Sequence, residues 1–268
     1  MHHEFLLVTI VNRLLGGTVA SLAHALGFTL DPAHAIPPHI VFSVVTVLII
    51  AALSLLVKSQ LSVENPGKLQ ILLEDLVGGI IGILREYIGP KGDRFLPLVG
   101  AVGLFIFVAN AIGKIPGLMS PTASINTTLG CAITVWVFYH LMGFREQGVV
   151  SYLKHFAVMP GAPIWTAPLV LIIEIISHAS RVLSLSLRLF GNVYGEEMVV
   201  AIIGSIVPFV APLPFMVLGV VTGTLQAFIF VMLTIIYLAA AVHTDHEHEA
   251  HAHEPGDHPH EAGAHAAA

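Results

Sequence analysis

Long apolar runs separated by short connections dominate this chain. Residues 39–57, 95–115 and 126–143 are mostly apolar. Each run has the length that one helical crossing of a bilayer requires, about 20 residues for ~30 Å of hydrocarbon. Connections containing Pro, Gly and Ser separate the runs, as is typical of loops. The pattern therefore predicts three simple transmembrane helices.

Two later apolar segments are too long for simple crossings. As continuous helices, residues 164–205 and 208–243 would extend ~63 Å and ~54 Å, roughly twice the thickness of the hydrocarbon core. Helices of this length must tilt steeply, bend or leave the membrane. The predicted architecture is an all-α membrane protein with five transmembrane helices, of which the last two are long.

Residues 66–88 show an amphipathic pattern instead. Lys68, Asp75 and Glu86 fall near one helical face, and leucine and isoleucine fill most of the remainder. A helix lying in the membrane interface fits this pattern. A buried re-entrant segment is the alternative, although it would have to bury five charged side chains, which is costly in a membrane.

Composition supports a membrane protein. Of the 268 residues, 56% are hydrophobic and 10% are charged, against about 25% charged residues in soluble domains. A single cysteine, Cys131, excludes a disulfide framework and a multi-cysteine metal site. Residues 1–38 lack the basic region of a cleavable signal peptide, so we expect them to remain as an N-terminal segment.

Positive charge predicts the orientation. The connections after the first and third crossings carry the residues Lys58, Lys68, Arg85, Lys91, Arg94, Arg145 and Lys154. The connections at 116–125 and 206–213 carry no Lys or Arg. The positive-inside rule therefore places the N-terminal segment outside and the C-terminus in the cytoplasm.

Arg188 is the strongest candidate for chemistry because it lies deep within the apolar segment 164–205. A charge at the centre of a membrane helix costs at least ~2.5 kcal/mol and marks a functional site by default. Glu174, Ser177 and Asn192 lie within about 40° of the Arg188 face of an ideal helix. For Ser177, a structural role in a hydrogen bond between helices is equally open.

Carboxylates lie on both sides of Arg188 along the predicted helix. Glu196 and Glu197 are displaced by ~12 to 13.5 Å in one direction, and Glu174 by ~21 Å in the other. This arrangement suits two half-channels that do not meet, with a fixed cation between them. His178, four residues after Glu174, either joins the second route or is a packing residue.

Several motifs resemble those of the subunit a family of F-type ATP synthases. They are the arginine segment Ser184–Asn192 with Glu196 and Glu197, the segment Leu225–Phe230, the pattern Asn110-x-x-Gly113-x-x-Pro116-Gly117, and the segment Pro121–Thr128. The resemblance covers roughly residues 39–243, and the arginine motif is highly specific.

The resemblance implies a tilted hairpin of the last two helices against a ring of c subunits. It implies that Arg188 is the essential cation opposite a ring carboxylate and that Gln226 lies beside it. Glu197 matches the acid of the outer half-channel, whereas Glu174 and Ser177 match positions of the inner one. The implied partners are the c-ring, the peripheral-stalk b subunits and the bilayer of a bacterial inner membrane, with no cofactor, no nucleic acid and no catalysis by the isolated chain.

Two positions depart from the family pattern. Ser124 stands where the family often has Asp, and Gly219 where it often has His, so the outer route is partly rearranged. Glu196 could supply the missing group, because on a helix it lies ~80° from Arg188 whereas Glu197 lies ~180° away. The sequence leaves the choice between Glu196 and Glu197 open.

The C-terminal segment supports a rival hypothesis. His243–Ala268 holds eight of the sixteen histidines and six acids, a composition typical of a disordered, possible metal-binding tail, and we assign residues 244–268 to this tail. The alternative function is a divalent-metal or proton-coupled secondary transporter. Against it, the membrane segments offer only His140 and His178 rather than a clustered ligand set, and show no paired broken helices.

Overall fold

The computed structural model describes residues 6–25, 27, 29, 31–62, 66–115, 117–148, 152, 166–207 and 210–242, and these residues contain no β-strand. The long helices are α1 (Leu6–Ala25), α2 (Pro38–Gln60), α3 (Lys68–Ile88), α4 (Leu96–Ile112), α5 (Ile125–Gln147), α7 (Ala167–Ile206) and α8 (Pro212–Val242). Two short 3-10 helices, η1 (Pro90–Phe95) and η2 (Pro121–Ala123), precede α4 and α5. Within the described residues, six helices are long and apolar enough to cross a membrane, and α3 is not among them.

Proline and glycine set the ends of several helices. Pro38 and Pro97 lie in the first turns of α2 and α4, where a missing N–H costs no helical hydrogen bond. Gly89 and Gly148 follow α3 and α5 with φ of 84° and 80°, a conformation that favours glycine. The apolar runs therefore become separate helices.

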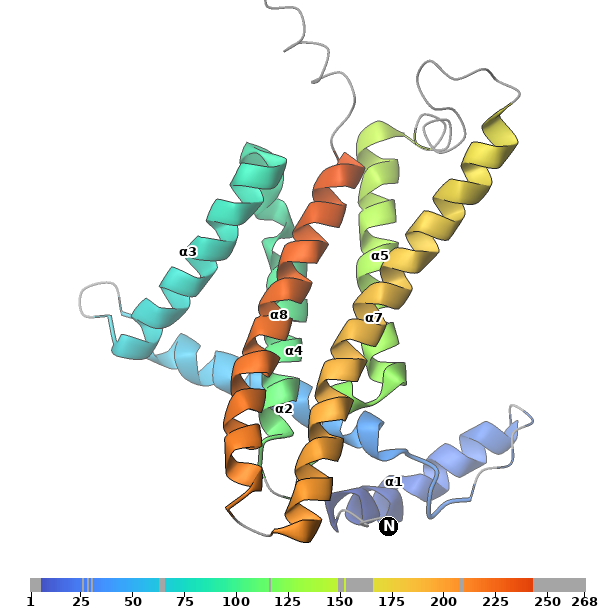
Figure 1. Cartoon of the computed structure of the whole chain (residues 1–268), viewed down its shortest axis with the longest axis vertical. Coiled ribbons are helices and arrows are strands. Elements are labelled where there is room, and N and C mark those ends of the chain that lie inside the picture. Colours follow the sequence, from blue (N-terminus) through green and yellow to red (C-terminus); the bar gives the residue numbers. More distant parts are fainter. Residues whose placement is uncertain are drawn as a thin grey trace, which may run out of the picture.

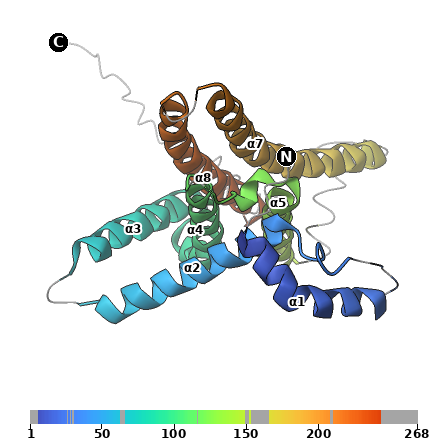
Figure 2. The ribbon, with the colours of Figure 1, turned by 90° about the horizontal axis from the view of Figure 1, so that it is seen from below.

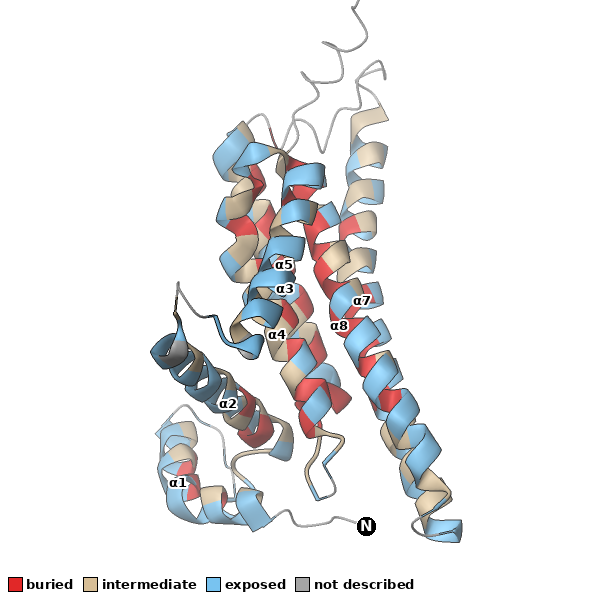
Figure 3. Cartoon of the chain, turned by 90° about the vertical axis from the view of Figure 1, so that its left-hand side faces the viewer, coloured by how far each residue is buried: buried red, intermediate tan, exposed pale blue. Residues whose placement is uncertain are grey.

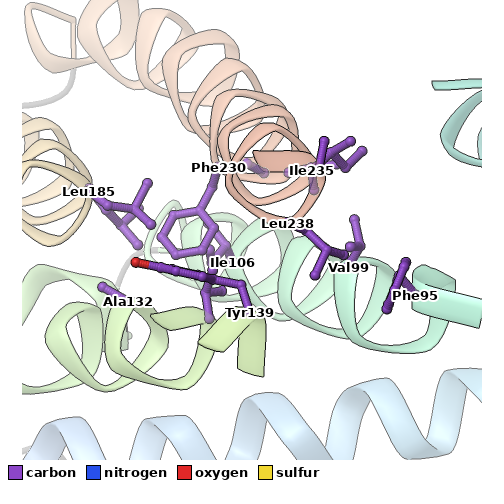
Figure 4. Packing of buried hydrophobic residues seen from close by; sticks show 14 of the residues in the cluster. Phe95, Val99, Ile106, Ala132, Tyr139, Leu185, Phe230, Ile235 and Leu238 are labelled. Atoms are coloured by element: carbon purple, nitrogen blue, oxygen red, sulfur yellow. The ribbon is translucent and has the colours of Figure 1, made fainter. Parts of the chain in front are cut away.

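Helices α4, α5, α7 and α8 pack around one apolar core (Figures 1 and 3). Phe230 of α8 meets Ile106 of α4, Leu185 of α7 and Tyr139 of α5 in the region where the four helices converge (Figure 4). The buried faces point inward and the outer faces remain exposed and largely apolar. A helical bundle in lipid is expected to be apolar both in its core and on its outer surface, because lipid tails require no polar groups at that surface.

The last two helices form an antiparallel hairpin, in contact with each other and with α5 (Figure 1). At ~1.5 Å per residue, α7 and α8 extend ~60 Å and ~46 Å. Helix α2 crosses this bundle at a steep angle, and both α2 and α3 extend away from it on the same side (Figures 1 and 2).

The all-α membrane fold predicted from the sequence is confirmed, and a helix occupies each of the five predicted apolar segments. The expected N-terminal segment 1–38 contains α1, a helix that was not among the five predicted crossings. Arg13, Gly16 and Gly17 interrupt its apolar run, so the pattern gave a weak signal. The side chain of Asn12 fixes α1 by accepting from the N–H of Ile36 at 2.8 Å and donating to its carbonyl at 3.0 Å.

Helix α3 lies within the amphipathic segment predicted at 66–88. It buries Leu84 and Ile88 against the bundle and leaves Leu72 and Leu76 exposed. An exposed apolar face of this kind is compatible with the membrane interface, and the location of α3 there stays a prediction.

Candidate functional site

Arg188 lies near the middle of α7 on its exposed face. Leu185 and Leu189, which flank Arg188 on α7, are buried in the bundle, whereas Leu187 beside it is exposed. No ion pair involves Arg188 within the part of the chain that the structure describes. The guanidinium is therefore an exposed cation without an anionic neighbour among the described residues, and it requires an anionic partner or water when this surface is in a membrane.

One helical turn further along, Asn192 connects α7 to α8. Its side-chain Nδ2 donates to Oε1 of Gln226 at 2.8 Å. Gln226 is only 1% exposed, and its Nε2 has no hydrogen-bond partner among the described residues. A buried donor without a partner is costly, so this amide is an unsatisfied polar group inside the bundle.

Glu196 and Glu197 lie near the end of the bundle at which α4 ends and α7 turns into α8. Oε1 of Glu196 forms an ion pair with Nζ of Lys114, just beyond α4. Oε1 of Glu197 accepts a hydrogen bond from the backbone N–H of Ser120 at 3.1 Å. The two adjacent acids therefore have different partners, one a cation and the other a peptide group.

The Glu196 carboxylate also reaches α8 at Gly219. A Cβ atom at that position would overlap the carboxylate, so only glycine leaves room for it. This geometry agrees with the idea that Glu196 fills the place of a larger side chain at position 219.

A chain of buried polar groups continues from Ser120. Its hydroxyl lies 2.7 Å from that of Thr122, which donates to Oδ1 of Asn110 at 2.6 Å. Asn110 in turn donates to the carbonyl of Gly223 at 3.0 Å. Gly223 precedes Gln226 by less than one turn of α8, so the chain leads from the vicinity of Glu197 toward the Gln226 amide.

A second polar cluster lies toward the other end of α7. His178 is 8% exposed; its Nδ1 lies 2.6 Å from the hydroxyl of Tyr139, and its Nε2 lies 3.2 Å from Oε1 of Glu174. The Arg181 guanidinium lies 5.3 Å from the centre of the Tyr237 ring, within the range of a cation–π contact. Ser177 is half-buried, and its carbonyl accepts a hydrogen bond from Ser180 at 2.7 Å.

Seven of the predicted site residues fall into three groups: Asn192 with Gln226, Glu174 with His178 and the nearby Ser177, and the adjacent Glu196 and Glu197. Arg188 lies apart from both acid clusters. The pattern did not identify Lys114, Ser120 or Tyr139 as members of these clusters, because each comes from a helix or loop remote in sequence. A lysine at the end of an apolar run was the signal that could have revealed Lys114.

Metal binding receives no support from the described residues, in which no group of three or more His, Cys, Asp or Glu side chains is placed to hold an ion. The His-rich segment 244–268 lies outside the described residues.

These features define a multi-pass, all-α membrane protein with ionisable groups inside its helical bundle. The family model of the ATP synthase A chain matches residues 40–239, and the chain belongs to this family. It therefore serves proton transport and ATP synthesis in a membrane, as one subunit of a larger complex.

Individual relatives agree along most of the sequence. ATP synthase subunit a of Geotalea daltonii is 46% identical over 181 residues, which are 68% of this chain and 77% of that protein. The subunit a of Geobacter sp. (strain M21) is 40% identical over 248 residues, which are 92% of this chain and 100% of the relative. The subunit a of Geotalea uraniireducens is 43% identical over 205 residues, covering 75% and 87% of the two chains. Membership in this family does not favour the alternative function of a divalent-metal or proton-coupled secondary transporter.

Proposed function

We propose that this chain is the stator subunit of the membrane sector, which provides two proton half-channels and the arginine that couples proton flow to rotation of a c-ring. The observation that carries the proposal is the position of Arg188. It is exposed at the middle of a long apolar helix of ~60 Å and has no ion-pair partner among the described residues. A rotating neighbour that presents one carboxylate at a time would supply the missing anion.

The acid clusters suit the two half-channels. Glu196 and Glu197 lie ~12 to 13.5 Å from Arg188 along α7, toward the proposed outer compartment. Glu174, with Ser177 and His178, lies up to ~21 Å away in the other direction, toward the proposed inner one. Each cluster offers protonatable groups near one end of the bundle, and the fixed cation between them opposes direct passage of a proton.

The coupling mechanism follows from the cost of charge in lipid. A ring carboxylate facing lipid is stable only in its neutral form, whereas beside Arg188 the ionised form gains a cation. The carboxylate therefore releases its proton to one half-channel at the stator and takes a new one from the other before it returns to lipid. A membrane potential contributes ~2.3 kcal/mol per charge per 100 mV. No covalent bond changes in this chain, so we propose that it is not an enzyme by itself.

The surface of the hairpin suits a large apolar partner. Val217, Leu218, Val221 and Leu225 of α8 are all exposed. We propose that the c-ring covers this region with the exposed face of α7, that both helices tilt strongly to fit the bilayer, and that b subunits complete the stator.

Basic residues support the proposed orientation in a bacterial inner membrane. Arg94 pairs with Glu146 at 2.8 Å, and Arg85 forms a two-point contact with Asp93, near the ends of α3 and α5. The positive-inside rule assigns this end to the cytoplasm, together with the C-terminus, and leaves the N-terminus outside.

Replacement of Arg188 by Ala tests the proposal. The variant should lose both ATP synthesis and ATP-driven proton pumping in inverted membrane vesicles, because the ring carboxylate no longer gains a cation when it ionises. Arg145→Ala is a matched control, since Arg145 is an exposed arginine at the end of α5, and it should leave both activities near normal. Immunoblots establish that both variants assemble.

An assembled Arg188→Ala complex with normal coupled synthesis would refute this mechanism. Copurification of this chain with a ring of small two-helix subunits would distinguish a stator subunit from a secondary transporter, because a transporter has no such ring as a partner.

A further inference from the structure

A largely buried ion pair lies where the ends of α4, α7 and α8 meet. Lys114 and Glu196 are in direct contact, and their side chains are only 14% and 15% exposed. The Glu196 carboxylate is additionally held over Gly219, where no side-chain atom competes for the space. Both partners of the pair are therefore fixed by packing from three segments of the chain.

Protonation of Glu196 would leave the Lys114 ammonium without its partner in this enclosed place. Removing one partner of a buried ion pair is strongly destabilising, because the remaining charge has lost its water and gained nothing. The pair therefore opposes a protonation cycle at Glu196.

Glu197 has no such constraint. No ion pair involves it within the described ranges, and its carboxylate accepts a hydrogen bond from the backbone N–H of Ser120 at 3.1 Å. A protonated carboxyl group retains an oxygen that can accept this hydrogen bond, so protonation leaves no charge exposed. The hydroxyl of Ser120 also begins the polar chain through Thr122 and Asn110 that approaches Gln226.

The Lys114–Glu196 pair also changes the surroundings of Glu197. Two adjacent ionised acids repel each other, and like charges disfavour ionisation. With the charge of Glu196 balanced by Lys114, Glu197 can gain and lose a proton without facing an uncompensated neighbour.

We propose that Lys114 and Glu196 form a fixed charge pair that carries no protons during turnover, which leaves proton transfer in the outer half-channel to Glu197, the acid that the family resemblance already implies. The inference rests on the proposed function and removes Glu196 from its outer route. Lys114 is then a positioning residue, which acts through Glu196 and through the field at Glu197.

A double-mutant cycle in the assembled ATP synthase tests this assignment. Lys114→Met and Glu196→Gln should each impair assembly or proton pumping, because each leaves one buried charge unpaired. The double variant Lys114→Met/Glu196→Gln removes both charges and should recover ATP-driven pumping to within about 2-fold of the wild type, since the coupling between neighbouring sites makes the single effects non-additive.

Glu197→Gln provides the second arm of the experiment. It should lower passive proton conduction, measured in vesicles stripped of the soluble sector, by about 100-fold or more, the lower end of the range for loss of a positioned proton-transfer group. Glu197→Asp, which keeps the carboxyl group, should retain part of the conduction. If the role of Glu197 were purely structural, assembled complexes of these two variants would conduct protons at the same rate.

Two results would overturn the inference: an assembled double variant that pumps no faster than Glu196→Gln, or a Glu197→Gln complex that conducts protons normally. Arg188→Ala in the same vesicles separates this failure from failure of the proposed function. If Arg188→Ala abolishes coupling while the double variant stays inactive, only the assignment of Glu197 is wrong. If Arg188→Ala pumps normally, the proposed function itself is wrong.

Discussion

Gly219→Ala should damage this protein far more than a glycine-to-alanine change in a helix ordinarily does. The Glu196 carboxylate occupies the space into which the new methyl group would project. Because the obstacle is the end of a side chain rather than backbone, the carboxylate can move away. It would then lose its contact with Lys114.

The contacts set the size of the effect. Breaking a buried ion pair so that one charge is left without a partner costs about 3–5 kcal/mol. Alanine is intrinsically better than glycine in a helix by about 1 kcal/mol, which offsets part of this cost. The side chains keep 14% and 15% of their surface exposed, so some hydration remains. The expected net destabilisation is therefore about 2–4 kcal/mol.

Two measurements report this destabilisation. They are the level of the subunit in membranes and the temperature at which ATP-driven pumping is lost. Gly130→Ala is the matched control, because Gly130 is a helical glycine of α5 with no atom within 4 Å of the new methyl group. The control should resemble the wild type. Equal thermal inactivation of Gly219→Ala and Gly130→Ala would show that Glu196 is not held over Gly219.

Two further predictions concern segments outside the hairpin. Removal of residues 245–268 should leave assembly and proton transport near normal, as measured by immunoblot and pumping, because a hydrophilic terminal segment beyond the last motif is tolerant of truncation. In α3, a cysteine at Lys68 or Glu86 should react with an aqueous maleimide from the cytoplasmic side, whereas one at Ile80 should be protected; equal protection of all three would favour the re-entrant alternative.

All of the long helices except α1 were predictable, because each depends on a local pattern. Apolar runs of bilayer length predicted α2, α4 and α5, and the length of the last two runs predicted two helices too long for simple crossings, whereas the hairpin of α7 and α8 was implied by the family resemblance. Arg188 stood out for the same reason, since a charge inside an apolar run needs no tertiary information to be recognised.

The contacts of the site depend instead on how distant helices pack. Lys114 and Glu196 lie 82 positions apart in the sequence, and Tyr139 and His178 lie 39 apart. Helical angles measured on α7 alone placed Glu196 closer than Glu197 to the Arg188 face. They could not show that a lysine beyond α4 occupies the space beside Glu196, because that depends on the register of α4 against α7.

The spacing of the three polar groups along α7 argues for a moving carrier. Direct proton transfer requires heavy atoms about 2.6–3.2 Å apart. Arg188 is separated from the acids on either side by ~12 Å and ~21 Å along the helix, distances that only a chain of water or a mobile group can bridge. A continuous water chain past Arg188 would dissipate the gradient without work, and the fixed cation opposes it. In the proposed function, a carboxylate carried by a second molecule, neutral in lipid and ionised only beside Arg188, would connect the two clusters without opening a continuous path. The distance between the clusters therefore makes proton flow depend on the motion of the carrier. A new acid placed one turn from Arg188 would shorten this distance and should uncouple proton flow from rotation.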